Sequence, residues 1–271
     1  MPFAMIGFTL AYKTIQNNHI NNPIWTVLLL VILSMIFARS AAMAFNRYID
    51  QQYDKLNVRT SVREIPAGII SSKNALLFVI INSVLFIATT YFINTICFLL
   101  SPVALFIILF YSYTKRFTPL CHLVLGLGLS LAPIGAYLAL LGHFALLPIL
   151  FSCIVFTWVS AFDILYALQD EAFDREHQLK SIPVLLGRKN ALLFSRILHT
   201  ITAIIVLSIA LFYLQNILYY IAATLFIGLL IFQHTLVKVN DISKVNLAFG
   251  TTNGVASILY ATFVILSILL F

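Results

Sequence analysis

The chain has 271 residues, of which 62% are hydrophobic and 9% are charged, and its mean hydropathy is +1.02. Such a chain has too little polar surface to cover a water-soluble fold of this length, so the sequence predicts an integral membrane protein. The net charge of +7 comes from basic residues in short segments between apolar runs, which indicates membrane topology and not a nucleic-acid-binding surface. The three cysteines show no paired spacing, so we expect neither disulfide bonds nor a zinc site.

Nine apolar runs approach the length of about 20 residues that a bilayer span requires. They cover residues 2–17, 23–47, 75–92, 95–112, 119–141, 145–168, 190–214, 217–236 and 246–271. The first run is the shortest, and it leads directly into further spans without a small-residue cleavage site, so we expect no cleaved signal peptide. The sequence therefore predicts an all-α, polytopic membrane protein, with about nine transmembrane helices in one domain over residues 1–271.

The basic residues are distributed unevenly between the two sets of connections. Thirteen of the sixteen Lys and Arg residues lie in or beside the connections after the second, fourth, sixth and eighth runs. The opposite connections, such as 17–22, 142–144 and 215–216, contain no Lys, Arg, Asp or Glu. By the positive-inside rule we expect the amino terminus and the charged loops on the cytoplasmic side of a bacterial-type inner membrane. All nine acidic residues lie on that side too, so we expect the chemistry there.

Two acidic patterns occur at the ends of apolar runs. They are Asn46-x3-Asp50-x3-Asp54 after the second run and Asp163-x6-Asp170-x3-Asp174 after the sixth. Residues four or seven apart share a helix face, so each set directs its side chains toward one point. Carboxylates at membrane helix ends are costly unless paired or metal-bound, and Mg²⁺ prefers carboxylate and phosphate oxygens. The sequence predicts that all six residues hold Mg²⁺ and a diphosphate, with Asp50, Asp54, Asp170 and Asp174 as the catalytic set.

A basic segment follows each acidic set. The segments are Arg59-Thr60-x2-Arg63-x2-Pro66-x-Gly68 and Lys180-Ser181-x-Pro183-x3-Gly187-Arg188. Their similarity indicates an internal duplication, and a pseudo-two-fold arrangement would bring the two acidic faces together. Cations beside Mg²⁺ would stabilise the charge of a departing diphosphate. The predicted diphosphate-binding residues also include the basic pair in Tyr111-x3-Lys115-Arg116, and they are Arg59, Arg63, Lys115, Arg116 and Lys180.

Three further residues are candidates for binding the second substrate. Arg39 lies two turns before Arg47 on the same helix, and a cation at that depth needs a partner. Tyr166 shares a helix face with Asp163 and is a candidate hydrogen-bond donor to a substrate. The six histidines show no ligand spacing, so we expect core or interface roles for them.

Taken together, these motifs resemble those of the UbiA superfamily of intramembrane aromatic prenyltransferases over essentially the whole chain. The resemblance implies a nine-helix bundle with a cytoplasmic-side cavity in which two Mg²⁺ ions bridge the aspartates to a polyprenyl diphosphate. It also implies an isoprenoid tail in a groove open to the lipid bilayer. The implied reaction transfers the polyprenyl group to a ring carbon of a hydroxylated aromatic acid such as 4-hydroxybenzoate, in ubiquinone or menaquinone biosynthesis. The implied anchor for the acid's carboxylate is Arg39, Arg47 or Arg116.

One departure from the family pattern leaves the acceptor open. Many members have Asp directly after the first Asn, whereas this chain has Arg47. The run 38–47 resembles a subgroup named for 4-hydroxybenzoate polyprenyl transfer, some members of which are associated with the futalosine route to menaquinone and its acceptor 1,4-dihydroxy-6-naphthoate. Two other classes fit less well. The chain lacks the Asp-Gly and Ala-Arg pattern of the CDP-alcohol phosphatidyltransferases, and a non-enzymatic transporter would carry its acids near the middle of the bilayer.

Overall fold

The computed structural model describes residues 1–17 and 24–271, and this part of the chain is almost entirely helical. The long helices are α1 (Pro2–Asn17), α2 (Ile24–Leu56), α3 (Ser72–Tyr91), α4 (Thr95–Thr114), α5 (Cys121–Leu141), α6 (Leu146–Ala167), α8 (Ile182–Phe212), α9 (Ile217–Leu236) and α10 (Asn253–Leu270). Three short elements complete the order: the 3₁₀ helix η1 (Leu168–Asp170), α7 (Glu171–Glu176) and the π-helix η2 (Leu247–Thr252). The predicted all-α fold of nine long helices is confirmed.

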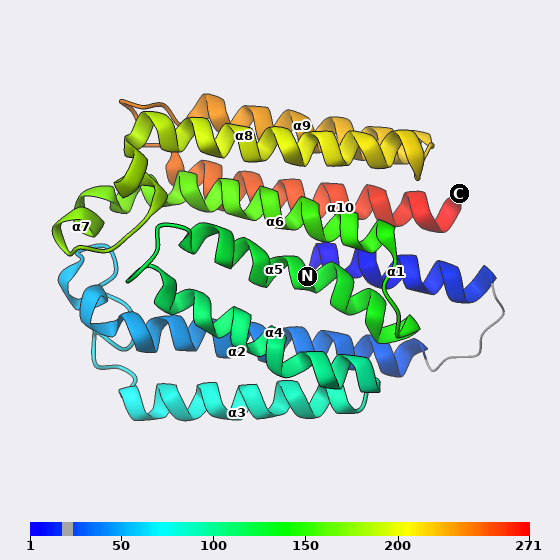
Figure 1. Ribbon diagram of the computed structural model, residues 1–271, viewed down its shortest axis with the longest axis horizontal. Helices are drawn as coiled ribbons and strands as arrows, with labels where there is room; N and C mark the ends of the chain where they lie inside the picture. The colour runs from blue at the N-terminus through cyan, green and yellow to red at the C-terminus, as the bar shows by residue number, and fades with distance from the viewer. Residues whose placement is uncertain (18–23) are drawn as a thin grey trace.

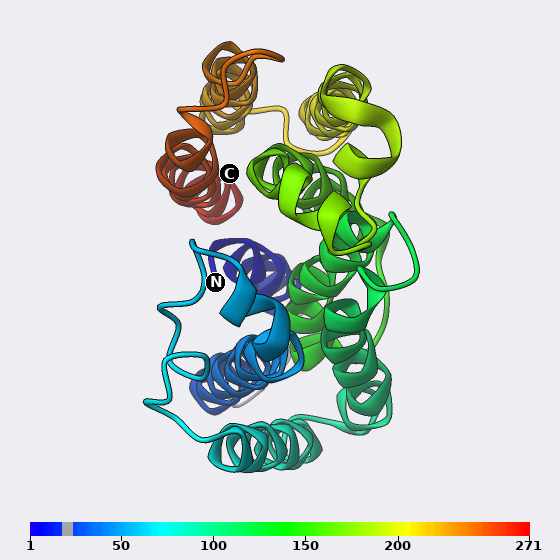
Figure 2. The ribbon, with the colours of Figure 1, turned by 90° about the vertical axis from the view of Figure 1, so that its left-hand side faces the viewer.

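The long helices lie side by side along one direction, as Figure 1 shows. The connections 57–71, 115–120, 168–181 and 237–246 meet at one end, together with α7. We call this the polar end of the bundle. Seen from that end in Figure 2, the helices surround the middle of the molecule, with α1 between the α2–α4 group and the α8–α10 group. The two acidic sets are thereby brought to one end of the bundle.

Eight of the described helical segments are long and apolar enough to cross a membrane. Many of their large apolar side chains face outward, such as Trp25 at 82% exposed and Phe106 at 63% exposed. In helices long and apolar enough to span a bilayer, outward-facing apolar side chains of this kind are covered by lipid. The protein is therefore a multi-pass membrane protein. The 16-residue helix α1 is not among these eight segments.

An aromatic cluster fills the middle of the bundle. The ring of Phe3 lies 5.3 Å from that of Trp158 and 5.6 Å from that of Tyr260, and Phe226 stacks on Tyr260 at 4.5 Å. The Tyr260 hydroxyl shares a 2.9 Å hydrogen bond with Tyr219, so its polar atom is satisfied inside the core. These contacts join α1, α6, α9 and α10 and fix the frame that supports the polar end.

Helix bounds near the acidic sets differ from the predicted ones. Helix α2 continues to Leu56, nine residues beyond the predicted end at 47, because neither Pro nor Gly interrupts it and the polar motif extends the helix past the apolar run. Helix α8 begins at Ile182 and not at 190, since Ser181 caps it by accepting a hydrogen bond from the Val184 amide. The non-helical φ of 72° at Gly187 kinks this helix, and the polar residues 188–190 that follow the glycine separate the apolar start of the helix from the predicted run.

The second acidic set does not lie on one continuous α-helix as predicted. Asp163 is on α6, Asp170 ends the 3₁₀ turn η1, and Asp174 is on α7. The predicted uncharged connection 17–22 lies, except for its first residue, outside the described residues.

Candidate active site

A cavity of about 280 Å³ opens at the polar end between α2, α4, α5 and the segment from α6 to α7. Both acidic sets and most of the predicted basic residues line it. The predicted residues at its wall are Asn46, Asp50, Asp54, Arg59, Arg63, Tyr111, Lys115, Arg116, Asp163, Tyr166, Asp170 and Asp174. Segments more than 100 positions apart in the sequence therefore form one polar site, as the duplication of the motif predicts.

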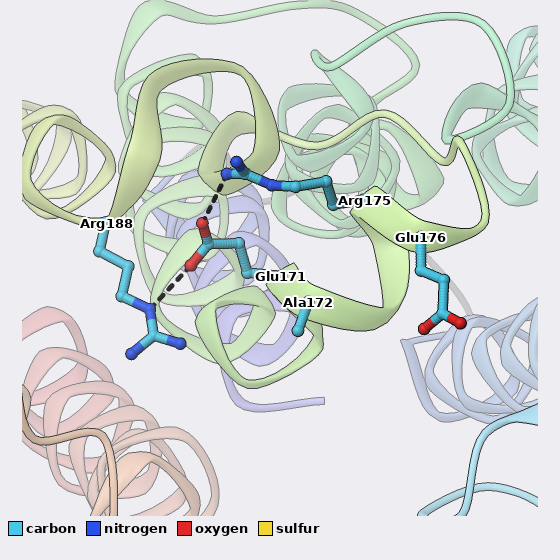
Figure 3. Close-up of a pocket in the computed structure, with 5 residues that line it drawn as sticks. All are labelled: Glu171, Ala172, Arg175, Glu176 and Arg188. Carbon is cyan, nitrogen blue, oxygen red and sulfur yellow. Dashed lines mark hydrogen bonds and ion pairs between the residues drawn. The ribbon is translucent and has the colours of Figure 1, made fainter.

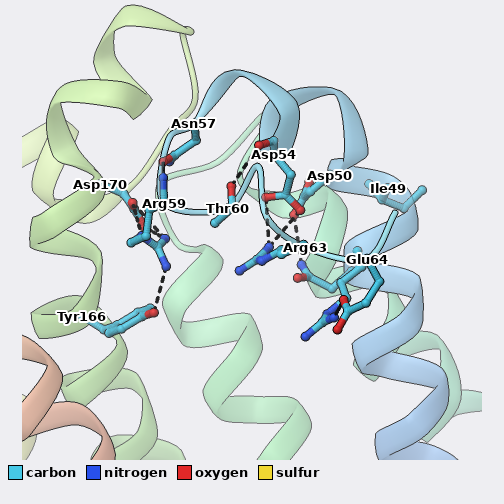
Figure 4. A network of polar contacts seen from close by, with 12 residues as sticks. Ile49, Asp50, Asp54, Asn57, Arg59, Thr60, Arg63, Glu64, Tyr166 and Asp170 are labelled. Carbon is cyan, nitrogen blue, oxygen red and sulfur yellow. Dashed lines mark hydrogen bonds and ion pairs between the residues drawn. The ribbon is translucent and has the colours of Figure 1, made fainter. Parts of the chain in front are cut away.

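The first acidic set lies on one face of α2. The Asn46 amide donates a 3.0 Å hydrogen bond to Asp50, one helical turn further on. Asp54, the next residue in this series, is buried, and both of its carboxylate oxygens lie 2.9 Å from Nη1 of Arg63. Figure 4 shows how the connection after α2 folds back so that Arg63 reaches this carboxylate. The hydroxyl of Thr60 supports the fold by donating to the backbone oxygen of Asp54 at 3.3 Å.

The second acidic set receives its cation from the same connection. Arg59 Nη2 lies 2.7 and 2.9 Å from the two carboxylate oxygens of Asp170, and its Nε lies 3.3 Å from one of them. Its Nη1 donates to the hydroxyl of Tyr166 at 3.0 Å, and the Tyr166 ring stacks on Phe249 of η2 at 4.0 Å. Burial lowers the pKa of Arg59, but the Asp170 charge outweighs it, so the pKa lies above its ordinary value. The Arg59–Asp170 ion pair thus links the connection after α2 to the second acidic set.

The basic pair after α4 supplies the cations for the two remaining aspartates, Asp174 and Asp50. Lys115 Nζ lies 2.7 Å from the carboxylate of Asp174, which is completely buried. Burial disfavours the Lys115 ammonium, but the Asp174 carboxylate raises its pKa above the ordinary value. Arg116 Nη2 lies 3.5 Å from Asp50 and donates to the Ile49 backbone oxygen at 2.7 Å.

Four ion pairs therefore account for the four aspartates of the catalytic set. Each pair joins one predicted metal ligand to one predicted diphosphate-binding cation: Asp50–Arg116, Asp54–Arg63, Asp170–Arg59 and Asp174–Lys115. Within the described residues no group of three or more His, Cys, Asp or Glu side chains is close enough to hold a metal ion. The donors are nevertheless all hard oxygens, which suits Mg²⁺. Each carboxylate that a metal ion takes would leave an Arg or Lys free for an anion.

Sequence reasoning missed one polar pair at this cavity. His122 on α5 contacts Asp163 on α6, with Nδ1 2.6 Å from Oδ2, and both residues line the cavity. The histidine is 3% exposed. Only the mutual arrangement of α5 and α6 brings the two residues together, and spacing along one helix contains no signal for it.

Three predicted site residues do not line the described cavity. Arg39 is exposed on α2, and Arg47 forms an ion pair with Glu64. Lys180 donates to the Phe117 backbone oxygen at 3.2 Å, which holds the connection after α7 against the connection after α4. Their predicted roles remain predictions.

A second, more open hollow of about 390 Å³ lies beside α7 and the start of α8 (Figure 3). Glu171 accepts hydrogen bonds there from Arg175 at 2.9 Å and from Arg188 at 2.7 Å. Its carboxylate is therefore already satisfied, and none of the predicted site residues lines this hollow. These contacts fasten α7 to α8, and we assign the chemistry to the smaller cavity.

Comparison with known proteins agrees with this architecture. The model of the UbiA prenyltransferase family matches residues 1–267. A 4-hydroxybenzoate octaprenyltransferase from Aliivibrio fischeri (strain MJ11) is 30% identical over 243 residues, which cover 88% of this chain and 83% of that protein.

Solved structures agree as well. The apo structure of a UbiA homologue from Aeropyrum pernix K1 has a TM-score of 0.85 at 28% identity and covers 98% of this chain and 95% of its own. A UbiA homologue from Archaeoglobus fulgidus bound to GPP and Mg²⁺ has a TM-score of 0.70 at 25% identity and covers 98% and 96%. The fold, the paired acidic sets and these matches lead to one conclusion: the chain belongs to the UbiA prenyltransferase family.

Proposed function

We propose that the protein transfers a polyprenyl group from a polyprenyl diphosphate to a ring carbon of a hydroxylated aromatic acid in a Mg²⁺-dependent reaction. The observation that carries the proposal is the set of four ion pairs between candidate metal ligands and candidate diphosphate-binding cations around one cavity. The names of the 4-hydroxybenzoate octaprenyltransferase relatives support the acceptor class. The GPP and Mg²⁺ in the Archaeoglobus fulgidus structure support the donor and the metal.

The proposed mechanism uses the residues of the cavity wall. Asp50, Asp54, Asp170 and Asp174 would hold Mg²⁺, with Asn46 and Asp163 in support, and the metal supplies positive charge that stabilises the diphosphate as a leaving group. Arg59, Arg63 and Lys115, once released from their carboxylates, would bind the phosphate oxygens, and Arg116 would be left for the acceptor.

Bond changes then follow in order. The bond between the allylic carbon and the diphosphate oxygen breaks, and its electron pair leaves with the diphosphate. The electron-rich ring carbon attacks the allylic cation, and the ring then loses its proton to a base in the cavity. Arg116 lines the cavity and is the best placed of the three candidate arginines to bind the acceptor carboxylate.

We further propose that the cavity faces the cytoplasm and that the amino terminus lies on the same side of the membrane. The concentration of Lys and Arg in the connections of the polar end supports this orientation. The polyprenyl tail would leave the polar end along the apolar helices and reach the bilayer.

Product analysis on membranes that contain the protein tests this function. The assay supplies Mg²⁺, a polyprenyl diphosphate, and equal amounts of 4-hydroxybenzoate and 1,4-dihydroxy-6-naphthoate. We expect one prenylated aromatic acid, and its identity decides between the two candidate acceptors. Membranes without the protein, and samples treated with a chelator, should give no product. Absence of both products from correctly folded protein would contradict the proposed acceptor class.

A further inference from the structure

We infer that the outward face of α8 near the polar end binds the headgroup of an anionic phospholipid, with Lys189 and Arg196 as the two cationic partners of its phosphate. This lipid site lies outside the candidate active site, since neither residue lines the described cavity. The inference does not depend on the proposed reaction or on the direction in which the protein crosses the membrane.

Lys189 and Arg196 lie on one exposed stripe of α8. They are seven residues apart in the part of the helix that follows the kink at Gly187, so they share a face about two turns apart. Both side chains are exposed, and so are the apolar side chains of Leu193, between them, and of Ile197, beside them, at 54% and 49%. We call these four residues the basic stripe of α8. Long basic side chains among apolar ones suit a surface that meets headgroups and acyl chains together.

The opposite face of the same stretch of α8 shows where the basic stripe lies along the bundle. Leu192 packs in an apolar cluster with Leu168 of η1 and Val237 of the connection after α9. The Ser195 hydroxyl donates a 2.8 Å hydrogen bond to the Ala161 backbone oxygen on α6. The 3₁₀ helix η1 and that connection belong to the polar end (Figure 1), so the stripe lies beside it. Long basic side chains at this depth can reach the headgroups of the adjoining leaflet.

The protein itself supplies no counter-charge for the basic stripe. Neither Lys189 nor Arg196 has an ion pair or a side-chain hydrogen bond with another of the described residues. The adjacent Arg188 behaves differently, because it shares the carboxylate of Glu171 with Arg175. That carboxylate is thereby already paired. A cation on the outward side of a membrane helix needs a partner of opposite charge, and the bilayer can provide one.

Charge and surroundings together select an anionic phospholipid. Helix α8 is long and apolar enough to cross a membrane, so acyl chains cover its exposed Leu and Ile side chains. Two long basic side chains about 10 Å apart along the helix can converge on one phosphate. A zwitterionic headgroup would bring an ammonium group that the two cations repel, whereas an anionic headgroup brings none. A free phosphate would leave the apolar part of the stripe without a partner.

Quenching of a site-specific fluorophore by brominated lipids tests the inference. A fluorophore on Leu193→Cys reports the lipid beside the basic stripe. One on Leu211→Cys, which is 62% exposed and about five turns further along the same face, reports the lipid near the other end of α8. Protein without an added cysteine gives the background from the three native cysteines. Comparing brominated phosphatidylglycerol with brominated phosphatidylcholine in nanodiscs gives their relative affinity at each position.

We expect the basic stripe to prefer phosphatidylglycerol by about tenfold at position 193, with no preference at position 211. Lys189→Gln/Arg196→Gln should reduce the preference at position 193 to about unity while leaving the quenching by phosphatidylcholine unchanged. Lys189→Arg/Arg196→Lys keeps both charges and should keep the preference. Each single glutamine variant should lower it in part, which retains the test if the double variant does not fold.

A matched control removes the same charge elsewhere. Lys55→Gln/Lys73→Gln neutralises two exposed cations on α2 and α3, which lie across the bundle from α8 (Figure 2). This variant should keep the full preference at position 193. A preference lost in this control, or one that persists in Lys189→Gln/Arg196→Gln, would show that overall surface charge attracts the lipid, and the inference would be wrong.

Two further outcomes would also overturn the inference. If neither lipid quenches the fluorophore at position 193, protein such as a second copy of the chain covers this face. If soluble glycerol phosphate displaces the brominated phosphatidylglycerol, the basic stripe binds free phosphate and not a lipid. Quenching that shows the expected preference and is insensitive to glycerol phosphate supports the lipid site.

Discussion

At the scale of single residues, the ion pairs of the cavity are arranged for exchange. Each of the four aspartates of the catalytic set is paired with a cation, so none of these four charges is buried without compensation before a substrate binds. A diphosphate and Mg²⁺ offer each member of a pair a partner of opposite charge. Binding can therefore replace one set of ion pairs by another at low cost in desolvation.

The pair Lys115–Asp174 gives the first prediction. Lys115→Met leaves the completely buried Asp174 carboxylate without its cation, and we expect a loss of about 3 kcal/mol of stability. This value is at the low end of the range for breaking a buried ion pair, because the Lys115 side chain is 33% exposed. Thermal unfolding in detergent measures this loss. The double variant Lys115→Met/Asp174→Asn should recover most of it, and a double variant no more stable than the single one would contradict the pairing.

The pH dependence of this loss follows from the raised pKa of Lys115. A basic group whose pKa is higher in the folded than in the unfolded protein contributes its full stabilisation at any pH below its pKa in the unfolded protein, which is about 10.4 for lysine. The stabilisation is lost as the pH rises through the pKa of the group in the folded protein. The contribution of the Lys115 charge to wild-type stability should therefore be constant from about pH 7 to pH 9, and the wild type should lose it only in stronger alkali.

Residue spacing explains which site residues could be predicted. Asp50 and Asp54 follow Asn46 at intervals of four on one helix, so their shared face was readable from the sequence. For His122 the absence of ligand spacing predicts a core or interface role, and its contact with Asp163, 41 positions away on another helix, could not be predicted. The ion pair between Arg47 and Glu64 was not predicted, because it depends on the return of the following connection to α2, for which the sequence has no local signal.

At the scale of helices, the contact between α5 and α6 sets the wall of the cavity. An added Cβ at Gly126 would stand 2.1 Å from Ser160 Oγ and 2.7 Å from the Phe156 backbone oxygen. The serine could rotate, but the backbone oxygen belongs to α6 and can move only with that helix. The small residue is therefore what lets the two helices meet one turn from His122 and Asp163.

Gly126→Ala consequently should force α5 and α6 apart. We expect a loss of about 1–3 kcal/mol in stability and weaker acceptor binding, measured by thermal unfolding and by the KM for the aromatic acid. Gly228→Ala on α9 is the matched control, since nothing lies within 4 Å of its added Cβ. The control should be neutral or slightly stabilising. Equal behaviour of the two variants would show that the close approach at Gly126 is not important.

The existence of each helix was easier to predict than the residues at which it begins and ends. Hydropathy predicted the apolar parts of α2 and α8, but α2 extends through polar sequence to Leu56, and α8 begins at Ile182, before the polar residues 188–190. The extensions are held by tertiary contacts and a serine cap, which a search for apolar runs does not detect. The 3₁₀ turn at Leu168–Asp170 likewise interrupts the acidic set on α6 without Gly or Pro to signal it.

At the scale of the whole molecule, charge and topology agree. The connections predicted to share one side of the membrane do meet at one end of the bundle, and the cavity opens there (Figure 1). Apolar composition is sufficient to predict a membrane bundle, because lipid requires both outward apolar side chains and internally paired backbone groups. The path of the connection after α2 across the cavity could not be predicted from the sequence. Arg59 and Arg63 both lie in this connection, but they reach different acidic sets.

The proposed cytoplasmic orientation predicts the labelling of single cysteines. Val58→Cys, at a position that is 91% exposed at the polar end, should react with a membrane-impermeant maleimide only in inverted vesicles. Phe144→Cys, in the connection between α5 and α6 at the opposite end, should react only from outside intact cells. The wild-type protein controls for its three native cysteines. The reverse pattern would place the cavity on the outer face.

The most direct test of the account measures product formation by Asp50→Ala and Asp170→Ala, one from each acidic set. If both sets hold one Mg²⁺–diphosphate unit, each variant alone should lose at least about 100-fold in turnover while remaining folded, because ligands from both halves are needed together. Asp241→Asn, in the exposed connection after α9, should keep wild-type activity as the control. A near-normal rate in either alanine variant would contradict the shared metal and diphosphate site.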